Sequence, residues 1–130
     1  MSNSILDASA LLALLNQEQG EQPVAHAVAG ETSMSAVNLS EVVAKLADLA
    51  MSEDEIRETL EPLGLEIIDF GGDDAYGAGL LRPATRTAGL SFGDRACLAL
   101  GARTGAPVLT ADQSWASLDL DVDVQISLIR

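Results

Sequence analysis

Four carboxylates occupy comparable positions in this sequence, each just after an apolar run or near the start of an expected helix. Taken singly, each has an ordinary explanation, because a side-chain oxygen at a helix start caps unpaired backbone N–H groups. Asn38 and Ser91 stand three residues before two of these acids, which is the spacing of a capping box. Together the acids predict a cluster, since ligand sites of open α/β sheets lie at the carboxyl ends of strands. The four are Asp7, Glu41, Asp94 and Asp112.

Such a cluster is unfavourable unless a cation neutralises the like charges. No lysine adjoins the four acids in the sequence, so the expected neutraliser is a hard divalent cation. Carboxylate oxygens and retained waters suit Mg²⁺ or Mn²⁺. These ions activate a water and stabilise the charge that builds on a phosphate, which favours phosphoryl chemistry. Because no nucleophile is placed beside a base, attack by a metal-activated water is expected, without a covalent intermediate.

The elements expected to position these acids alternate between strand and helix. This alternation predicts an α/β domain with a mostly parallel central sheet and helices on both of its faces. Pro83 is expected to break the helix that begins at Asp73. The expected strands cover 5–6, 32–35, 65–70, 107–110 and 122–129, and the other expected helices cover 8–15, 24–29, 38–50, 53–60 and 91–104.

Length and composition bound the classes of protein. The chain has 130 residues, 48% of them hydrophobic, which predicts a single domain with one core over residues 1–130. Cys97 is the single cysteine and His26 the single histidine, so an internal disulfide and cysteine- or histidine-rich metal sites are excluded. No apolar run approaches the roughly 20 residues of a membrane span. The N-terminus lacks a signal-peptide pattern, so a cytoplasmic location is expected.

The charge is strongly negative but unevenly distributed. A net charge of −13 disfavours broad contact with nucleic acid, which normally requires a basic face. Residues 75–111, however, carry four arginines against one aspartate, a local balance of +3. Arg82, Arg86 and Arg95 are therefore candidates for contact with RNA phosphates. The alternative for each of them is an ion pair with a neighbouring acid, or simple exposure to solvent.

Four segments, in this order along the chain, resemble the motifs of PIN-domain ribonucleases. They are 5–15, 38–42, 85–100 and 108–112. The third segment, which contains Gly89-Leu90-Ser91-Phe92-Gly93-Asp94, is closely similar to the corresponding motif of VapC-type toxins of bacterial toxin–antitoxin pairs. Each motif alone is weak, but the four together span nearly the whole chain.

The resemblance implies a three-layer α/β/α fold and a metal-dependent endoribonuclease. It gives metal-site roles to the four acids and supporting polar roles to Thr110 and Ser9. It also implies a homodimer and a cognate antitoxin, whose basic side chain, an arginine, would cover the acidic site. Some relatives carry a further acid two residues after the fourth. This chain has Ser114 there, which weakens the ligand set for a second metal.

Two other classes of function compete with this hypothesis. A catalytically silent PIN module would only bind a partner, and a metal titration would distinguish it from a nuclease. A phosphoaspartate protein, either a receiver domain or a dehalogenase-like phosphatase, is a poor match. Such a phosphatase requires Asp-x-Asp, whereas Asp7 is followed by Ala8-Ser9, and a receiver requires a lysine after a late strand, whereas Lys45 lies within a helix.

Overall fold

Five short parallel strands, in the order β3-β2-β1-β4-β5, form the central sheet of the computed structural model, which describes residues 3–130. In the register of the sheet, Ile5 of the central strand pairs with Ser33 on one side and Val108 on the other. Since all the strands are parallel, their carboxyl ends lie at one edge. The strands are β1 (Ser4–Leu6), β2 (Thr32–Ser35), β3 (Glu66–Ile68), β4 (Val108–Thr110) and β5 (Ile126–Leu128).

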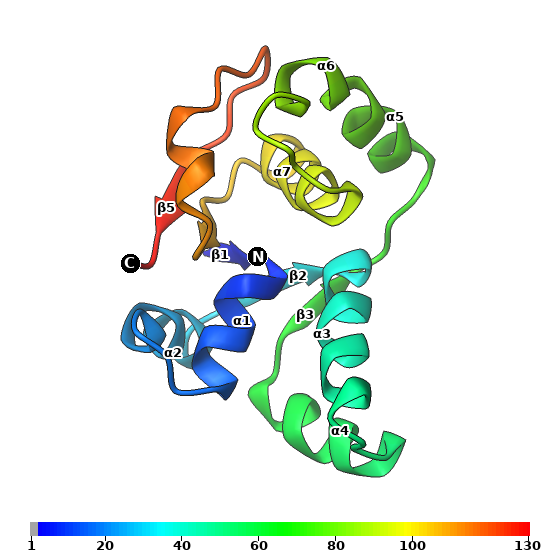
Figure 1. The fold of residues 1–130 in the computed structure, drawn as a ribbon, viewed down its shortest axis with the longest axis vertical. Coiled ribbons are helices and arrows are strands. Elements are labelled where there is room, and N and C mark those ends of the chain that lie inside the picture. Colours follow the sequence, from blue (N-terminus) through cyan, green and yellow to red (C-terminus); the bar gives the residue numbers. More distant parts are fainter. Residues whose placement is uncertain (1–2) are drawn as a thin grey trace.

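Two helical layers cover the sheet, one on each face, which confirms the predicted three-layer α/β/α architecture (Figure 1). The layer on one face holds α1 (Ala8–Leu15), α2 (Glu21–Ala29), α3 (Ala36–Asp48) and α4 (Glu53–Leu60). The layer on the other face holds α5 (Gly72–Leu80), α6 (Arg82–Thr85) and α7 (Phe92–Thr104). Two short 3-10 helices, η1 (Glu61–Leu63) and η2 (Gln113–Ser117), complete the described elements.

The sheet separates two hydrophobic cores, because successive strand residues point to opposite faces. Leu6 and Leu109 pack into the core beneath α1, α2, α3 and α4. Ile5 and Val108 pack into the other core, which also buries Trp115 and, as expected, Cys97.

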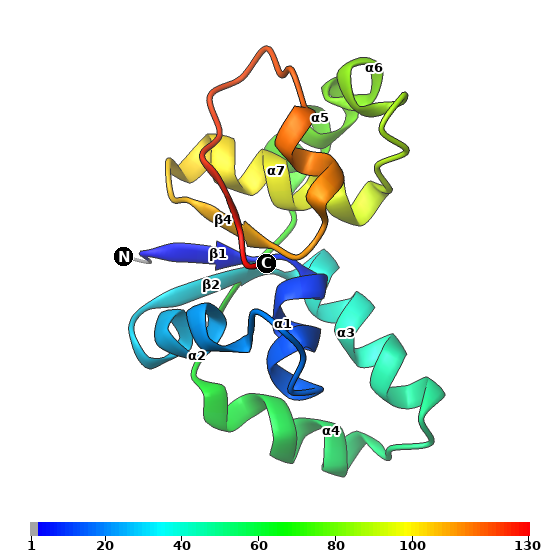
Figure 2. The same cartoon turned by 60° about the vertical axis from the view of Figure 1, so that its left-hand side comes forward.

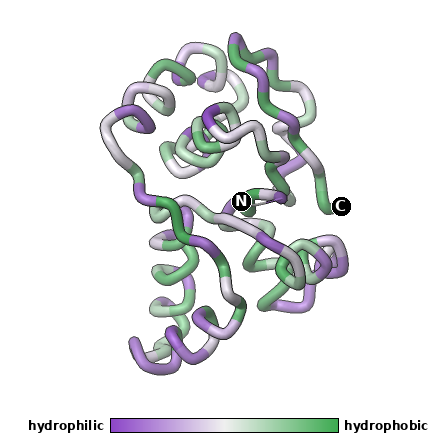
Figure 3. Tube along the Cα trace, turned by 180° about the vertical axis from the view of Figure 1, so that it is seen from behind, coloured by the Kyte–Doolittle hydropathy of each residue, from purple (hydrophilic) through white to green (hydrophobic). Residues whose placement is uncertain are grey.

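Hydrophilic residues are concentrated on α4, at the bottom of Figure 3. Within residues 3–130, none of the helices is both long and apolar enough to cross a membrane.

The start of α3 differs from the prediction in a way that matters for the site. The helix begins at Ala36 and not at Asn38, because the Ser35 hydroxyl accepts a hydrogen bond from the Val37 N–H at 3.2 Å and caps it. Asn38 and Glu41 therefore lie within the helix, and the capping-box explanation for Glu41 is wrong.

Other boundaries differ by a few residues. α2 begins at Glu21 instead of residue 24, because Pro23 falls in the first turn, where its missing N–H breaks no helical hydrogen bond. The last strand is shorter than the predicted 122–129, since its pairing partner β4 offers only three residues. The predicted break near Pro83 is confirmed: α5 ends at Leu80, and Pro83 lies in the first turn of α6. The predicted capping box at Ser52 is confirmed.

Candidate functional site

Asp7 is the most enclosed carboxylate of the site. It follows β1 directly, and extended backbone dihedrals at this residue let its side chain turn back over the first turn of α1. Its Oδ1 accepts hydrogen bonds from the Ala10 backbone N–H at 2.8 Å and from the Ser9 hydroxyl at 2.7 Å. Only 3% of the residue is exposed. The helix-cap role considered for Asp7 is therefore real, and the residue lies where the chain passes from β1 into α1, a junction that Figure 2 shows at the edge of the sheet.

Two hydroxyls connect Asp7 to the end of β4. Thr110 donates from Oγ1 to Asp7 Oδ2 at 2.5 Å and accepts from the Asp112 backbone N–H at 3.0 Å. Ser9 accepts from the Ala111 backbone N–H at 2.9 Å while donating to Asp7. Both residues predicted to support the acids thus lie against Asp7. Their hydrogen bonds join the carboxyl ends of two adjacent strands and bring Asp112 to the same edge.

Glu41 reaches the site from α3 through a contact that sequence reasoning missed. The Asn38 amide donates from Nδ2 to Glu41 Oε1 at 2.8 Å and to the Gly93 carbonyl oxygen on α7 at 3.0 Å. The Glu41 carboxylate lies where a Cβ on Gly93 would be. The sequence offered one signal for this contact, a glycine in the first turn of the helix expected at 91–104, because Asn38 itself has the residue type and position of a helix cap.

Asp94 and Asp112 both cap helices in the structure. Asp94 forms a capping box with Ser91: its Oδ2 accepts from the Ser91 N–H at 2.9 Å, and the Ser91 hydroxyl accepts from the Asp94 N–H at 3.2 Å. Asp112 starts η2, where its Oδ1 accepts from the Ser114 N–H at 3.0 Å and from the Ser114 hydroxyl at 2.7 Å. The structural explanation of these acids is therefore observed at three of the four positions.

Capping leaves part of each carboxylate available, because the cap at each of these residues uses one of the two oxygens. Among the residues that the structure describes, no donor bonds the second oxygen of Glu41, Asp94 or Asp112. A carboxylate can accept at both of its oxygens. Each of these acids can therefore cap a helix, or accept from a neighbouring amide, and still offer an oxygen to another ligand.

The pKa shifts of two buried groups involve three of the four acids. Burial raises the pKa of Asp7 to about 6, opposed by the hydrogen bonds from Thr110, Ala10 and Ser9, and the nearby negative charge of Asp94 raises it further. Burial also raises the pKa of the Cys97 thiol, with added contributions from the charges of Asp7, Asp94 and Glu41. The charges of Asp7, Asp94 and Glu41 thus all act on one buried thiol, although within residues 3–130 they are not gathered around a metal position.

The acid-bearing segments also match a known family. The family model described as the PIN domain matches residues 4–120. This chain belongs to the PIN-domain family. The match includes all four acids and confirms the resemblance seen in the sequence. No curated protein matches the chain at a comparable level.

Solved structures share the fold of this PIN domain over nearly its whole length. A DNA-bound VapBC from Salmonella typhimurium has a TM-score of 0.75 at 15% identity, with 100% of both chains covered. VapBC2 from Rickettsia felis, bound to a promoter DNA fragment, has a TM-score of 0.73 at 15% identity, covering 96% of this chain and 97% of that one. A toxin–antitoxin complex from Klebsiella pneumoniae has a TM-score of 0.70 at 18% identity, with 88% and 91% covered.

The donor set of this PIN domain suits a hard divalent cation. The buried Asp7 carboxylate has hydrogen-bond donors but no cationic partner among residues 3–130. Within the same residues, no three histidine, cysteine, aspartate or glutamate side chains are arranged to hold an ion as they stand. Mg²⁺ is usually held by only one or two carboxylates and keeps several waters. The spare carboxylate oxygens at this edge match that way of binding.

The three candidate arginines differ in their surroundings. Arg95 donates from Nη1 to the Ala78 carbonyl oxygen at 3.1 Å and lies 5.9 Å from the centre of the Phe92 ring, so it ties α7 to α5. Arg82 and Arg86, on α6 and just after it, are exposed, and neither forms an ion pair within the described part of the chain. Of the three, these two are free to contact a phosphate.

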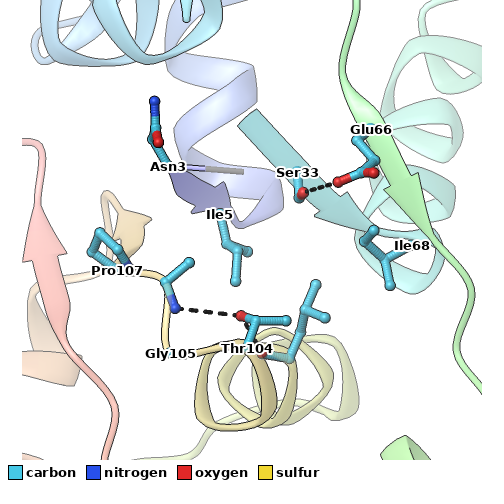
Figure 4. Close-up of a pocket in the computed structure, with 10 residues that line it drawn as sticks. Asn3, Ile5, Ser33, Glu66, Ile68, Thr104, Gly105 and Pro107 are labelled. Carbon is cyan, nitrogen blue, oxygen red and sulfur yellow. Dashed lines mark hydrogen bonds between the residues drawn. The ribbon is translucent and has the colours of Figure 1, made fainter. Parts of the chain in front are cut away.

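A cavity elsewhere in the molecule does not overlap the acids. It has a volume of about 490 Å³ and lies between the sheet and the end of α7 (Figure 4). Ile5, Thr104 and Pro107 line it together with Ser33, whose hydroxyl donates to Glu66 Oε1 at 3.0 Å. None of the four acids lines this cavity, so the candidate site is an open edge of the sheet and not this pocket.

Proposed function

We propose that this PIN domain is a metal-dependent endoribonuclease of the VapC toxin type. The observation that carries the proposal is the buried Asp7 carboxylate, which lies near the charge of Asp94 and has no cationic partner in the part of the chain that the structure describes. A buried carboxylate without a cation is unfavourable unless a ligand supplies the charge. A metal ion drawn by these acids would explain why the chain tolerates that cost.

Different residues of the chain would have different roles in the hydrolysis of an RNA phosphodiester. Ser9 and Thr110 hold Asp7 in place, and the caps of Asp94 and Asp112 leave one oxygen of each available. Bound Mg²⁺ or Mn²⁺ would supply the positive charge that activates water and stabilises the developing charge on phosphate. The exposed Arg82 and Arg86 would contact the RNA backbone.

Partners of this PIN domain belong to the same proposal. An apolar groove of about 440 Å³ lies between α3 and α4, with Leu39 and Val43 on its wall. Glu41 lies on another face of α3, so an antitoxin segment bound in this groove would have to continue around the start of α3 to place an arginine among the acids. Tyr76 and Leu80, exposed on one face of α5, are where we expect a second copy to pack.

The decisive experiment compares cleavage with folding. Purified protein should cleave RNA in Mg²⁺ or Mn²⁺ and stop when EDTA is added. Asp94→Asn should abolish cleavage while the metal-free melting temperature changes little, since asparagine still offers an oxygen to the Ser91 N–H. Cleavage that continues in excess EDTA would contradict the mechanism. Persistent cleavage per folded molecule in Asp94→Asn would leave Asp94 with a capping role alone.

A catalytically silent, partner-binding PIN module is the second candidate. It is favoured by the absence, within residues 3–130, of carboxylates already gathered around a metal position. A calorimetric titration with Mn²⁺ separates the two: a nuclease binds the ion, with Asp7→Asn and Asp94→Asn each weakening it. In a silent module, the wild-type protein would bind Mn²⁺ no better than these two variants do.

A further inference from the structure

One buried amide joins the helix that carries Glu41 to the helix that carries Asp94. Asn38 is 1% exposed. Its Nδ2 donates to Glu41 Oε1 on its own helix and to the Gly93 carbonyl oxygen, 55 residues away in the sequence, on α7. The Asn38 side chain therefore sets both the direction of the Glu41 carboxylate and its position relative to α7.

The orientation of this amide follows from the chemistry of its partners. A carboxylate and a backbone carbonyl can only accept hydrogen bonds, so the NH₂ group must face them. The carbonyl oxygen Oδ1 is then left buried without a partner within the described part of the chain. An unpaired buried oxygen is unfavourable, whereas an apolar side chain of similar size would fill the space without that cost. Stability alone therefore does not explain an asparagine here.

Gly93 provides the space that this arrangement needs. Its backbone is helical, so it does not require glycine for conformational reasons. A Cβ at this position would overlap the carboxylate group of Glu41. Asn38 thus holds the Glu41 carboxylate from one side, and the missing side chain of Gly93 lets it approach the start of α7.

We propose that Asn38 and Gly93 together position the Glu41 carboxylate against the start of α7 and thereby set the metal affinity of the acidic edge. This inference rests on the proposed metal-dependent function. Asn38 acts through Glu41: it occupies Oε1 and leaves Oε2 to face a ligand. Outer residues that orient a metal-binding side chain commonly change affinity by about 10- to 100-fold.

The test is a Mn²⁺ titration of the whole chain, by calorimetry, with thermal melting in EDTA as the measure of folding. Asn38→Leu removes the donor but keeps most of the volume, and Gly93→Ala displaces the flexible end of Glu41. We expect each to weaken Mn²⁺ binding by about 10-fold while the protein stays folded. Gly79→Ala is the matched control, because a Cβ there meets no atom within 4 Å. It should leave Mn²⁺ affinity unchanged.

A double-mutant cycle shows whether Asn38 acts through Glu41. In a Glu41→Gln background, Asn38→Leu should cause no further loss of Mn²⁺ affinity. In RNA cleavage at a subsaturating Mn²⁺ concentration, the single variants should be slower per folded molecule, and excess Mn²⁺ should restore the rate, which a smaller folded fraction would not explain. If Asn38→Leu does not fold, Gly93→Ala with its control decides the question alone.

The possible failures are distinguishable. Wild-type protein that binds Mn²⁺, together with wild-type affinity in both folded variants, would overturn this inference and leave the proposed function standing. An equal loss from Asn38→Leu with and without Glu41→Gln would also overturn it. Wild-type protein that binds no Mn²⁺ would overturn the proposed function and this inference with it.

Discussion

Asp7 and Asp74 are two buried aspartates with opposite surroundings. Asp7 is 3% exposed and Asp74 is 7% exposed. Asp74 accepts from Arg103 Nε at 2.8 Å and from its Nη2 at 3.2 Å, so a guanidinium on α7 neutralises it in the fold. Among residues 3–130, Asp7 accepts only from two hydroxyls and one backbone N–H, none of them charged.

The difference separates a carboxylate that an arginine of the described chain neutralises from one that no described cation neutralises. Asp74 pairs α5 with α7 and needs nothing from outside the chain. Burial without a cation instead raises the pKa of Asp7 to about 6, so near neutral pH its negative charge is held at a cost. Perturbed carboxylates of this kind are more common at functional sites than in structural ion pairs.

The largest expected effect is on catalysis by Asp7→Asn. Asparagine can still accept from the Ala10 N–H, but it removes the charge that attracts a metal. RNA cleavage should fall by more than about 100-fold, beyond the usual effect of an outer residue. Asp74→Asn is the paired control and should cleave normally per folded molecule. If both variants lose RNA cleavage per folded molecule to the same extent, Asp7 has no catalytic role that Asp74 lacks.

The pH dependence of stability sharpens the same comparison. A carboxyl whose folded pKa is raised contributes stability when protonated and loses that contribution as pH rises from its unfolded pKa, 3.8, through about 6. For Asp7 the loss in the free energy of unfolding is up to about 3 kcal/mol. In metal-free protein, the free energy of unfolding of Asp7→Asn should therefore rise relative to that of wild type as the pH is raised from 4 to 7. Denaturant unfolding across this range measures the difference.

Added Mn²⁺ should return the lost stability to wild-type protein at pH 7 but not to Asp7→Asn, because a ligand bound to the folded state alone stabilises that state. If the free energy of unfolding differs between wild type and Asp7→Asn by the same amount at every pH from 4 to 7, the pKa of Asp7 is not raised. The other carboxyls cancel in this difference, since both proteins share them.

A smaller change in stability is expected for Asp74→Asn. Breaking a fully buried ion pair costs about 3–5 kcal/mol, but 46% of the Arg103 side chain is exposed and water can solvate it. The free energy of unfolding should therefore fall by only about 1–2 kcal/mol, measured by urea unfolding at pH 7. Mn²⁺ affinity should be unaffected. A change in Mn²⁺ affinity larger than the change in stability would mean that Asp74 also serves the site.

The smallest effect belongs to Arg86→Ala, at the exposed positive stretch. It should leave Mn²⁺ affinity intact, weaken RNA binding and lower the slope of log affinity against log salt by about one phosphate contact. Arg57→Ala is the control, because Arg57 is already paired with Glu53 and Glu61 on the surface of α4. An identical salt slope in wild type and Arg86→Ala would remove Arg86 from the RNA-binding surface.

Local features of this protein were predictable from the sequence. The capping box at Ser52 and the helix break at Pro83 depend on residues within a turn of each other, and both are present. The alternation of strand and helix predicted the three layers. Helix starts were less predictable: α3 begins at Ala36 because Ser35 competes with Asn38 as the cap, and both residue types favour that role.

The sequence by itself determined that acids would stand at the ends of strands and the starts of helices, because those positions follow from local hydrophobic pattern and capping chemistry. Only the tertiary structure decided which partners they have. Thr110 meets Asp7 across 103 residues, and Arg103 meets Asp74 across 29. The sequence placed Asp7 at a strand end and Asp74 in the first turn of a helix, but it did not show which of the two has a cationic partner. Their difference arises when the parallel sheet brings one strand end beside another, while helix packing puts a guanidinium within reach of Asp74 alone.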